Sequence, residues 1–490
     1  MPTRHMVVGG GPAGIFAIET IREVDPGASI TLVSDEPPYS RMVLPYHIAG
    51  QIPEAHVYTG DTAYWQRLGV TAVTGRRVTA IEPDRGRLVV SDGSSVPFDE
   101  LLLATGSSPV QPDIPGARGE RVYNLWTLAD AQRTLRVLDR VNGRVIGGVN
   151  GGRKARVVFI GAGFIGFIVL NALAKIGCAL EVVELEGQIL PRMLDPEAAG
   201  LGRRWLETRG IGVHTGVRAV EIGDADGGKT VRLSSGATLR SELVVMAIGV
   251  RPNVDLARSA GLRVDHGIVV DHHLRTSTGH VYAAGDCAQG PDLSTGGLAV
   301  HAIQPTAVEH GRVAGANMAG RPTRYAGSLS MNILDVVGLQ CASFGLWRGD
   351  GRETTVVTNP GRPVYRKLVW EGDRVVGAIL LGPAEDVALL NDLGMVKGLI
   401  QTQVSLGPWA RELKANPMDV RRAFVAAGTP AALLDRTLLG RRLDAQRYRF
   451  EDRVPQHAAE RAAQVLEQIK LDPTRGKGGG TREASNVVPD

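Results

Sequence analysis

Two glycine-rich segments, about 150 residues apart, have residue types and spacing that suit phosphate binding. In a Gly-x-Gly-x-x-Gly pattern, the first glycine permits a tight turn from strand to helix, the second lets the backbone approach a pyrophosphate, and the third lets the helix pack on the strand. The phosphates then lie at the helix N-terminus, where amide groups and the helix dipole favour negative charge. Two such sites on one chain suggest that electrons pass from one bound dinucleotide to another. The glycines are Gly9, Gly11 and Gly14 in the first segment and Gly161, Gly163 and Gly166 in the second.

Acidic residues follow each segment at the distance expected of a ribose-binding carboxylate. The predicted strand Ile30–Val33 is followed by Asp35 and Glu36, and the predicted strand Leu180–Val183 ends at Glu184. A carboxylate about 20 residues beyond the glycines can accept hydrogen bonds from a ribose 2′-hydroxyl. Because Glu184 would repel a 2′-phosphate and no arginine follows at once, the second site is predicted to prefer NADH over NADPH.

Strands and helices alternate around both segments, which predicts parallel, doubly wound sheets. Helices are expected over Ile15–Glu23 and Phe167–Ile176. Ser95–Gly106 has the composition of a buried strand that ends in a turn of small residues, and Glu242–Gly249 has the same character. The two regions therefore look like two copies of one plan.

Beyond about residue 326 the pattern changes to strands separated by Gly, Asp and Pro turns and then to helices, which predicts a smaller α+β domain. A glycine-rich linker is expected over Asn142–Arg153, a charged helix over Gln456–Leu471, and a disordered tail from Gly476. The expected strands are Val336–Phe344, Thr354–Val357, Val364–Trp370 and Val375–Leu381, and the expected helices are Val387–Gln401 and Met418–Ala427.

The composition is that of a soluble globular protein, with 490 residues, 43% hydrophobic and 22% charged. No apolar run reaches the ~20 residues of a membrane span, and the first strand is expected to start so close to Met1 that no signal peptide is predicted. The three cysteines are too scattered for a metal-ligand cluster, so a cytoplasmic location is expected. The net charge of +4 could help an acidic redox protein dock, although a dispersed solvated surface is the favoured interpretation. No basic run with interleaved aromatics indicates nucleic-acid binding.

Further motifs, in order along the first ~380 residues, resemble those of the FAD- and NAD(P)-dependent oxidoreductases with two dinucleotide-binding domains, the pyridine nucleotide-disulfide oxidoreductase superfamily. Tyr39–Gly50 is similar to the segment that runs beside the flavin, and Ala104–Gly106 to the strand-turn motif. Gly249–Asn253 resembles the return from the NAD domain, and Val281–Ala288 the motif whose aspartate holds the FAD ribityl chain. The most similar branches are the rubredoxin and ferredoxin reductases and the flavin-binding half of NADH nitrite reductase.

The resemblance implies an α/β fold with two Rossmann-like dinucleotide-binding domains and a smaller C-terminal α+β domain. The FAD domain is then discontinuous, made from residues 1–125 and 246–325, with an NAD domain inserted at 126–245. Residues 326–450 would form an interface or dimerisation domain, and residues 451–490 a helix and tail.

The same resemblance assigns FAD to the first segment and NAD(H) to the second. Asp35 or Glu36 would hold the adenosine ribose and Asp286 the ribityl hydroxyls, and a helix starting at Gln304–Ala307 would point its positive end at the flavin. His301 and His310, close by, are better interpreted as packing or surface residues. No catalytic side chain and no metal ligand are required. The residues expected to contact FAD are Gly9, Gly11, Pro12, Ala13, Gly14, Asp35, Glu36, Arg41, Val78, Ala104, Thr105, Gly106, Gly285, Asp286 and Pro305, and those expected at the dinucleotide site are Gly161, Gly163, Phe164, Ile165, Gly166, Glu184 and Gly249.

Three positions depart from the relatives. Met42 stands where some relatives carry a reactive cysteine, and a thioether cannot form a thiolate. Cys287, next to Asp286, is interpreted as a packing residue, so disulfide reductase, peroxidase and cysteine-assisted oxidase activities are disfavoured. Ile168 replaces a common glutamate near the nicotinamide, which would alter the rate of hydride transfer or the cofactor preference, and Tyr46 replaces a common lysine.

The function expected from these features is that of an FAD-dependent NADH oxidoreductase. Hydride would pass from NADH to the flavin, and electrons would then pass to a small iron–sulfur or other redox protein. The alternatives are a quinone or oxygen as acceptor, or a flavoprotein subunit with a scaffold or regulatory role. The chain is expected to be a homodimer or a subunit of a redox complex. The stretch Asn391–Gln401 extends past the usual end of the relatives and would serve as core, dimer contact or docking surface.

Overall fold

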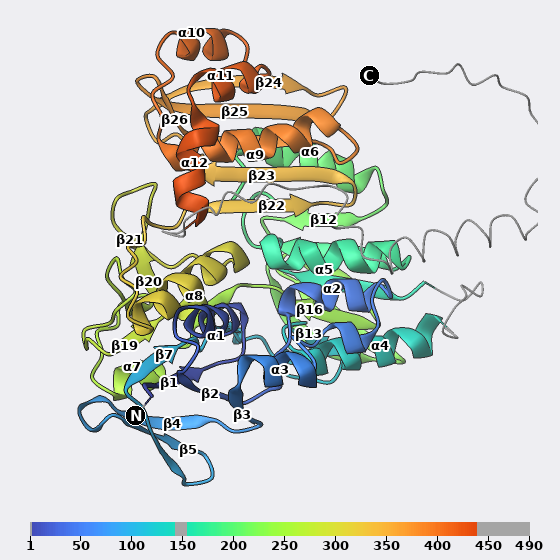
Figure 1. The fold of residues 1–490 in the computed structure, drawn as a ribbon. Coiled ribbons are helices and arrows are strands. Elements are labelled where there is room, and N and C mark those ends of the chain that lie inside the picture. Colours follow the sequence, from blue (N-terminus) through green and yellow to red (C-terminus); the bar gives the residue numbers. More distant parts are fainter. Residues whose placement is uncertain (1, 143–153, 439–490) are drawn as a thin grey trace, which may run out of the picture. The chain divides into compact units, whose positions relative to one another are not determined.

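The computed structural model describes residues 2–142 and 154–438 (Figure 1). The predicted helix Gln456–Leu471, the tail from Gly476 and all but the first residue of the predicted linker lie outside the described residues. Three five-stranded sheets organise the described part of the chain. Two of them are parallel and one is antiparallel.

The first parallel sheet has the order β19-β7-β1-β2-β3. After β1, Gly11 precedes helix α1, which begins at Pro12. The apolar residues Ile15, Ile18 and Ile21 recur along one face of α1 and are buried. Helix α8 packs on α1 through Gly311 and Gly315, where a side chain would overlap the backbone of α1. The elements are β1 (Arg4–Val8), α1 (Pro12–Val24), β2 (Ser29–Ser34), β3 (Val70–Thr74), β7 (Glu100–Leu103), β19 (Val281–Ala283) and α8 (Gln304–Met318).

The second parallel sheet repeats this plan with the order β12-β11-β10-β16-β9. Strand β10 lies between β11 and β16, as β1 lies between β2 and β7. A three-stranded antiparallel sheet follows in each copy, β4-β5-β6 in the first and β13-β14-β15 in the second. The prediction of two copies of one plan is therefore confirmed. The elements are β9 (Val122–Tyr123), β10 (Arg156–Ile160), α5 (Phe164–Lys175), β11 (Ala179–Glu184), β12 (Gly212–Thr215), β16 (Leu243–Met246), β4 (Val78–Glu82), β5 (Arg87–Val90), β6 (Ser95–Pro97), β13 (Ala219–Ala225), β14 (Gly228–Leu233) and β15 (Thr238–Ser241).

The strand predicted within Ser95–Gly106 is in fact two strands. Strand β6 pairs antiparallel with β5, whereas β7 pairs parallel with β1. Pro97 ends β6 because it has no amide hydrogen to donate to a ladder. Only Glu100–Leu103 therefore belongs to the parallel sheet that carries the first glycine turn.

The antiparallel sheet, order β22-β23-β26-β25-β24, forms the C-terminal domain, with helix α9 packed against β26. The strand predicted at Val336–Phe344 starts only at Leu339, because Val337 and Gly338 adopt positive φ angles in a turn. Strand β22 and the helices α10 and α12 were not predicted. The elements are β22 (Met331–Asp335), β23 (Leu339–Gly345), β24 (Glu353–Asn359), β25 (Val364–Glu371), β26 (Arg374–Pro383), α9 (Val387–Thr402), α10 (Pro408–Ala415), α11 (Val420–Ala426) and α12 (Thr429–Leu438).

The remaining helices and strands connect these sheets. The C-terminal domain contacts the second parallel sheet's domain where the Tyr365 hydroxyl and the Lys367 ammonium both reach the Asp195 carboxylate, at 2.7 and 3.2 Å. The remaining elements are η1 (Arg41–Val43), α2 (Leu44–Ile48), η2 (Glu54–His56), α3 (Thr62–Leu68), η3 (Pro83–Arg85), β8 (Ser107–Pro109), α4 (Leu128–Asn142), α6 (Pro196–Glu207), β17 (Val250–Pro252), α7 (Asp255–Ser259), β18 (Ile268–Val269), η4 (Gly285–Cys287), β20 (Ala288–Pro291) and β21 (Leu298–Ala299).

Candidate functional site

In the first glycine turn, the three glycines have different surroundings. Gly9 has a φ of +109°, and a Cβ there would overlap the Ala104 carbonyl oxygen. A Cβ on Gly14 would overlap the Gly9 carbonyl oxygen, so both positions exclude a side chain. Gly11, by contrast, faces open space and precedes α1, whose first amides have no side-chain cap. Uncapped amides beside open space suit the pyrophosphate of a dinucleotide.

The second turn is built in the same way. Gly161 has a φ of +101°, and a Cβ there would overlap the Ala247 carbonyl oxygen. A Cβ on Gly166 would lie 2.9 Å from the Ala247 side chain, which is too close. At Gly163 the nearest atom to a Cβ is 3.9 Å away, and α5 also starts without a side-chain cap. Phe164 and Ile165 form the first turn of α5. Both turns therefore fit a pyrophosphate at their second glycine.

Glu184 is buried against the second turn. One carboxylate oxygen accepts a 2.6 Å hydrogen bond from the Ala162 amide, and the other accepts a 2.9 Å bond from the Glu186 amide. The carboxylate is thus held at the end of β11, where a ribose would lie if the pyrophosphate sits at α5. A cavity of about 460 Å³ adjoins this loop and is lined by Glu186, Gly187, Gln188, Pro191, Leu194, Asp195, Pro196, Trp347 and Arg348.

The equivalent position in the first sheet is Ser34. The Gly9 amide donates to the Val33 carbonyl, just as the Gly161 amide donates to the Val183 carbonyl. The residue after Val33 therefore stands where Glu184 stands in the second sheet. Asp35 lies one residue further on.

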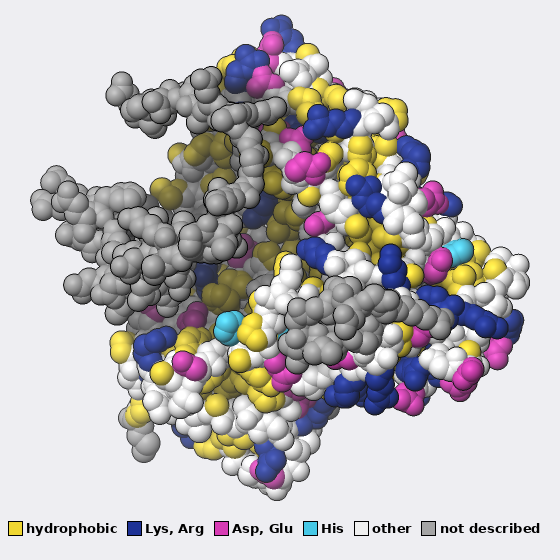
Figure 2. Space-filling view, turned by 90° about the vertical axis from the view of Figure 1, so that its right-hand side faces the viewer, with side chains coloured by type: hydrophobic (Ala, Val, Ile, Leu, Met, Phe, Trp, Pro, Cys, Tyr) yellow, Lys and Arg dark blue, Asp and Glu magenta, His cyan; other side chains and the backbone are white. Residues whose placement is uncertain are grey.

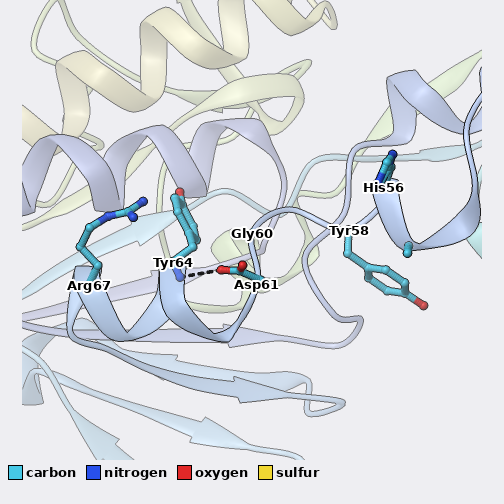
Figure 3. Close-up of a pocket in the computed structure, with 7 residues that line it drawn as sticks. His56, Tyr58, Gly60, Asp61, Tyr64 and Arg67 are labelled. Carbon is cyan, nitrogen blue, oxygen red and sulfur yellow. Dashed lines mark hydrogen bonds between the residues drawn. The ribbon is translucent and has the colours of Figure 1, made fainter. Parts of the chain in front are cut away.

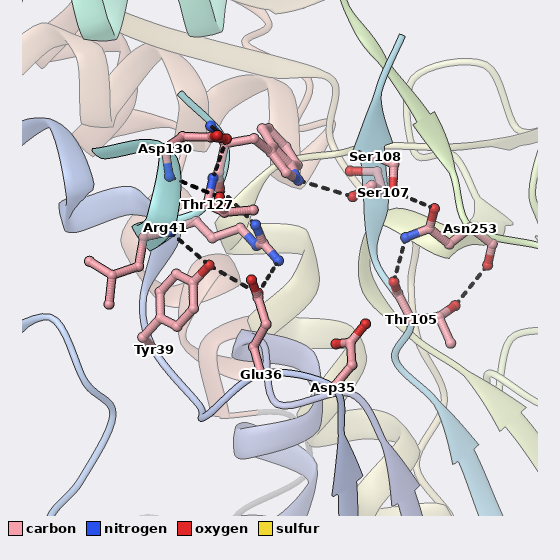
Figure 4. Close-up of polar contacts among 12 residues, drawn as sticks. Asp35, Glu36, Tyr39, Arg41, Thr105, Ser107, Ser108, Thr127, Asp130 and Asn253 are labelled. Atoms are coloured by element: carbon pink, nitrogen blue, oxygen red, sulfur yellow. Dashed lines mark hydrogen bonds and ion pairs between the residues drawn. The ribbon is translucent and has the colours of Figure 1, made fainter. Parts of the chain in front are cut away.

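Asp35 and Glu36 have different partners, and those of Glu36 are drawn in Figure 4. Asp35 is exposed and pairs with Arg77 at 2.5 Å. Glu36 accepts hydrogen bonds from the Tyr39 hydroxyl at 3.0 Å and from Arg41 at 2.8 Å. Glu36 therefore orients Arg41.

Arg41 also lies between two aromatic rings. Its guanidinium is 5.5 Å from the ring centres of both Tyr39 and Trp126, and it donates to the Trp126 carbonyl at 2.7 Å. The Trp126 indole in turn donates to the Ser107 carbonyl at 3.2 Å. This network connects the segment after β2 with the strand-turn motif.

Asp286 lies in η4, deep in the first domain. Its carboxylate accepts a 2.7 Å hydrogen bond from the Ser107 hydroxyl, and burial raises its pKa. The neighbouring Thr105 and Asn253 exchange two 2.8 Å hydrogen bonds, which tie the Ala104–Gly106 turn to β17. A partly buried carboxylate with one side-chain hydrogen bond has capacity left for the hydroxyls of a ligand.

The other predicted contacts are also located. Gly285 has a φ of +77° and leads into Asp286. Pro305 lies in the first turn of α8, which has no side-chain cap, and Gly249 has a φ of +112° in the connection to β17. Val78 is buried at the start of β4. His310 is fully buried, as expected of a packing residue.

The sulfur atoms offer no nucleophile to this site. Met42 is 41% exposed in η1. Cys287 is completely buried, its thiol lies 3.4 Å from the Leu103 and Ala284 carbonyl oxygens, and burial raises its pKa. Cys341 is buried as well, with a raised pKa, and Cys178 lies at the end of α5 away from both glycine turns. Each thiol therefore favours its protonated form or lies apart from the site.

Ile168 is half-buried on α5 and packs against the hydrophobic core, and Tyr46 is 51% exposed on α2.

On the face shown in Figure 2, Lys and Arg side chains are interspersed with Asp and Glu, which agrees with a dispersed charged surface. Within residues 2–142 and 154–438, no group of His, Cys, Asp and Glu could hold a metal ion. Among the same residues, no helix is long and apolar enough to cross a membrane.

A second pocket lies on the surface beside α3 (Figure 3). Asp61 caps α3 by accepting a 2.8 Å hydrogen bond from the Tyr64 amide, and the Tyr64 hydroxyl donates to Glu19 at 2.9 Å. The polar groups of Asp61 and Tyr64 are thus engaged in local structure. The lining residues are Ala55, His56, Tyr58, Gly60, Asp61, Tyr64 and Arg67.

Four residues of the site were not predicted: Ser107, Trp126, Asn253 and His310 as a partner of Gly285. Asn253 and Ser107 stand inside or next to motifs that the sequence did single out. Trp126 and His310 carry no local signal, because their partners are distant in the sequence.

The fold and the two turns define an oxidoreductase that uses a flavin and a pyridine nucleotide. The chain matches the pyridine nucleotide-disulphide oxidoreductase family over residues 3–305 and the rubredoxin NAD+ reductase C-terminal domain over residues 331–394. The chain belongs to the pyridine nucleotide-disulphide oxidoreductase family and is an FAD-dependent NAD(P)H oxidoreductase.

Individual relatives extend over most of the chain. Subunit epsilon of the NADH-dependent phenylglyoxylate dehydrogenase of Aromatoleum evansii is 31% identical over 432 residues, covering 86% of this chain and 97% of the relative. The ferredoxin–NAD(+) reductase component of the anthranilate 1,2-dioxygenase system of Burkholderia cepacia is 30% identical over 386 residues, covering 78% and 91%. The structure of an NAD-dependent persulfide reductase from A. fulgidus, 27% identical, superposes with a TM-score of 0.75 over 88% of this chain and 84% of that chain.

Proposed function

We propose that the first glycine turn binds FAD, that the second binds NADH, and that the reducing equivalents leave the flavin for a small iron–sulfur protein. The domains would be those expected from the sequence, an FAD domain of residues 1–125 and 246–325 around an NAD domain of residues 126–245, with a C-terminal domain from 326 to 450. The observation that carries the proposal is the pair of matching turns, each with an open second glycine and uncapped helix amides.

Three features of the first domain would hold the cofactor. The α1 amides would bind the pyrophosphate, with Arg41 supplying a nearby cation. Asp286, fixed by Ser107, would accept hydrogen bonds from ribityl hydroxyls. The uncapped start of α8 would face the flavin with its positive end. Bound FAD supplies the chemistry, accepting a hydride from NADH and releasing electrons one at a time.

The second domain would select NADH over NADPH through Glu184. Its carboxylate is buried and already held by two amides, so a 2′-phosphate placed there would face an uncompensated negative charge. A ribose hydroxyl would instead donate a hydrogen bond to the same oxygen atoms. NADH is therefore the proposed electron donor.

The absence of an exposed low-pKa thiol near the described site supports direct transfer from flavin to acceptor. One relative that spans most of the chain is named as a ferredoxin–NAD(+) reductase component, which supports an iron–sulfur acceptor. The buried free thiols of Cys287 and Cys341 support a cytoplasmic location. Steady-state turnover with NADH and a ferredoxin or rubredoxin, compared with menadione and oxygen, tests the acceptor. Faster turnover with either small molecule would contradict the proposal.

A second candidate role is that of a flavoprotein subunit in a larger redox complex. It is favoured by the relative named as subunit epsilon of a phenylglyoxylate dehydrogenase, because the alignment covers 97% of that subunit. Anaerobic purification of the tagged protein from its own cells distinguishes the two roles. Stoichiometric co-elution of other subunits supports the complex, and elution of the chain alone supports a free reductase.

A further inference from the structure

His310 is a buried polar side chain in the middle of α8, only 1% exposed. Its Nδ1 atom lies 3.3 Å from the Gly285 amide nitrogen, which donates a hydrogen bond to it. A Cβ on Gly290 would lie 3.6 Å from Cε1 of the imidazole, and the Tyr325 ring makes a T-shaped contact with His310 at a centroid distance of 4.9 Å. The ring is therefore confined to one orientation.

The direction of this hydrogen bond determines where the imidazole proton lies. A backbone amide can only donate, so Nδ1 must be the unprotonated acceptor and the neutral ring must carry its proton on Nε2. Nε2 lies 3.4 Å from the Ser328 hydroxyl. Burial lowers the pKa of His310 to about 3, which keeps the ring neutral at physiological pH.

The hydrogen bonds beyond Ser328 have fixed directions too. The Tyr325 hydroxyl donates to the Glu309 carboxylate at 2.8 Å, so its oxygen is left to accept. The Ser328 hydroxyl, 2.9 Å away, therefore donates to Tyr325 and is left to accept from Nε2 of His310. Ser328 and Tyr325 are both buried. This relay, Gly285 to His310 to Ser328 to Tyr325 to Glu309, holds the imidazole in the one tautomer that can accept from Gly285.

Gly285 is the residue on which the relay acts. It adopts a φ of +77°, and a Cβ there would lie 3.1 Å from the Ala13 side chain at the start of α1 and 3.5 Å from the Ala307 side chain on α8. The next residue is Asp286, whose carboxylate accepts from Ser107. The orientation of the Gly285 peptide thus sets where Asp286 lies relative to the N-terminus of α1.

We propose that His310 is a positioning residue for the flavin cofactor. Its Nδ1 atom fixes the Gly285 amide and thereby aims the Asp286 carboxylate at the ribityl chain. This proposal rests on the proposed FAD site. It extends that site to the buried relay, none of whose side chains touches the cofactor in this account.

The test compares FAD binding by the full-length protein with binding by three variants. Asparagine can place an amide oxygen near the position of Nδ1, whereas glutamine reaches toward the position of Nε2 and leucine offers no acceptor. His310→Asn should bind FAD within about threefold of the wild type. His310→Gln and His310→Leu should each raise the FAD dissociation constant about tenfold, because the buried Gly285 amide loses its acceptor. The flavin midpoint potential and visible spectrum should shift in His310→Gln and His310→Leu and stay near those of the wild type in His310→Asn.

A variant at the far end of the relay keeps the proposal testable if His310→Leu does not fold. Tyr325→Phe removes the acceptor of Ser328 without touching Gly285, and should weaken FAD binding a few-fold with a smaller change of potential. Equal FAD affinity and potential in the wild type, His310→Gln and Tyr325→Phe would overturn the relay while leaving the FAD site intact. Equal losses of FAD affinity in His310→Asn, His310→Gln and His310→Leu would also overturn the proposal, because packing rather than the Nδ1 acceptor would then explain them. A wild-type protein that binds no FAD would overturn both proposals.

Discussion

The Ser107 hydroxyl donates a 2.7 Å hydrogen bond to the Asp286 carboxylate, joining two residues that are 179 positions apart. Ser107 follows the Ala104–Gly106 turn, and Asp286 follows the positive-φ glycine of η4. The bond therefore connects the segments that follow β7 and β19, which are adjacent strands of the first parallel sheet, at the ends that carry the proposed flavin site. It leaves the remaining acceptor positions of the carboxylate for a ligand.

Replacement of Asp286 by alanine should weaken FAD binding about 10- to 100-fold, because hydrogen bonds to a charged group contribute about 1.5–3 kcal/mol. Ser107→Ala should weaken it only a few-fold, since the carboxylate stays in place but loses its fixed orientation. Equilibrium dialysis or flavin fluorescence measures both constants. Ser108→Ala is the matched control, because its hydroxyl bonds Asn253 instead. Equal effects of Ser107→Ala and Ser108→Ala would contradict the role given to Ser107.

Glu184→Gln should lower kcat/KM for NADH about tenfold and raise it for NADPH, so that the preference between them narrows. The variant keeps an acceptor for the Ala162 amide but removes the charge that repels a 2′-phosphate. Glu186→Gln, in the same loop but exposed, is the control and should leave the ratio unchanged. An unaltered NADH:NADPH ratio in Glu184→Gln would refute this assignment.

Removal of all three thiols should leave electron transfer from NADH to an iron–sulfur acceptor within about twofold of the wild type. A protein carrying Cys178→Ser, Cys287→Ala and Cys341→Ala tests this, with alanine chosen at the two buried positions to avoid an unsatisfied hydroxyl. Thermal unfolding provides the control for stability. If the folded, FAD-loaded variant lost turnover more than tenfold, a thiol would have to take part.

Glu100 should make the protein less stable as the pH rises. Burial raises the pKa of this carboxyl from 4.5 to about 7, so the folded state holds a proton that the unfolded state releases between these values. The native state therefore binds more protons in this window, and the free energy of unfolding falls as the pH increases from 4.5 to 7. Glu100→Gln should remove this loss and stabilise the protein by roughly 1–2 kcal/mol at pH 8, with little difference at pH 4. Urea unfolding at both pH values measures it, and a destabilised variant at pH 8 would be the contrary result.

The sequence could predict features whose cause is local. The glycine turns, the positions of β1, β2, β10 and β11 and the acid at Glu184 follow from spacing within about 30 residues. Each glycine's separate role is then visible in the structure, because only Gly11 and Gly163 face open space. The repetition of one sheet order in two domains was also predictable from the two similar motif series.

What the sequence could not predict depends on register and on contacts between distant segments. Ser34 stands at the position of Glu184 because both follow the strand residue that accepts from the first glycine, which becomes apparent only from the pairing. Pro97 divides what looked like one strand between two sheets. In the sequence, His310 resembles any packing histidine. Only its contacts with Gly285 and Ser328 show which ring nitrogen accepts a hydrogen bond and which carries the proton.

In the proposed function, NADH reduces a flavin bound at the first turn, and the electrons then leave without a thiol intermediate. Anaerobic rapid mixing of the FAD-loaded protein with NADH tests it most directly, followed by addition of an oxidised ferredoxin or rubredoxin. We expect rapid loss of the visible flavin absorbance with NADH, slower loss with NADPH, and recovery when the iron–sulfur protein is added. Flavin absorbance that stays constant with both nucleotides would contradict it.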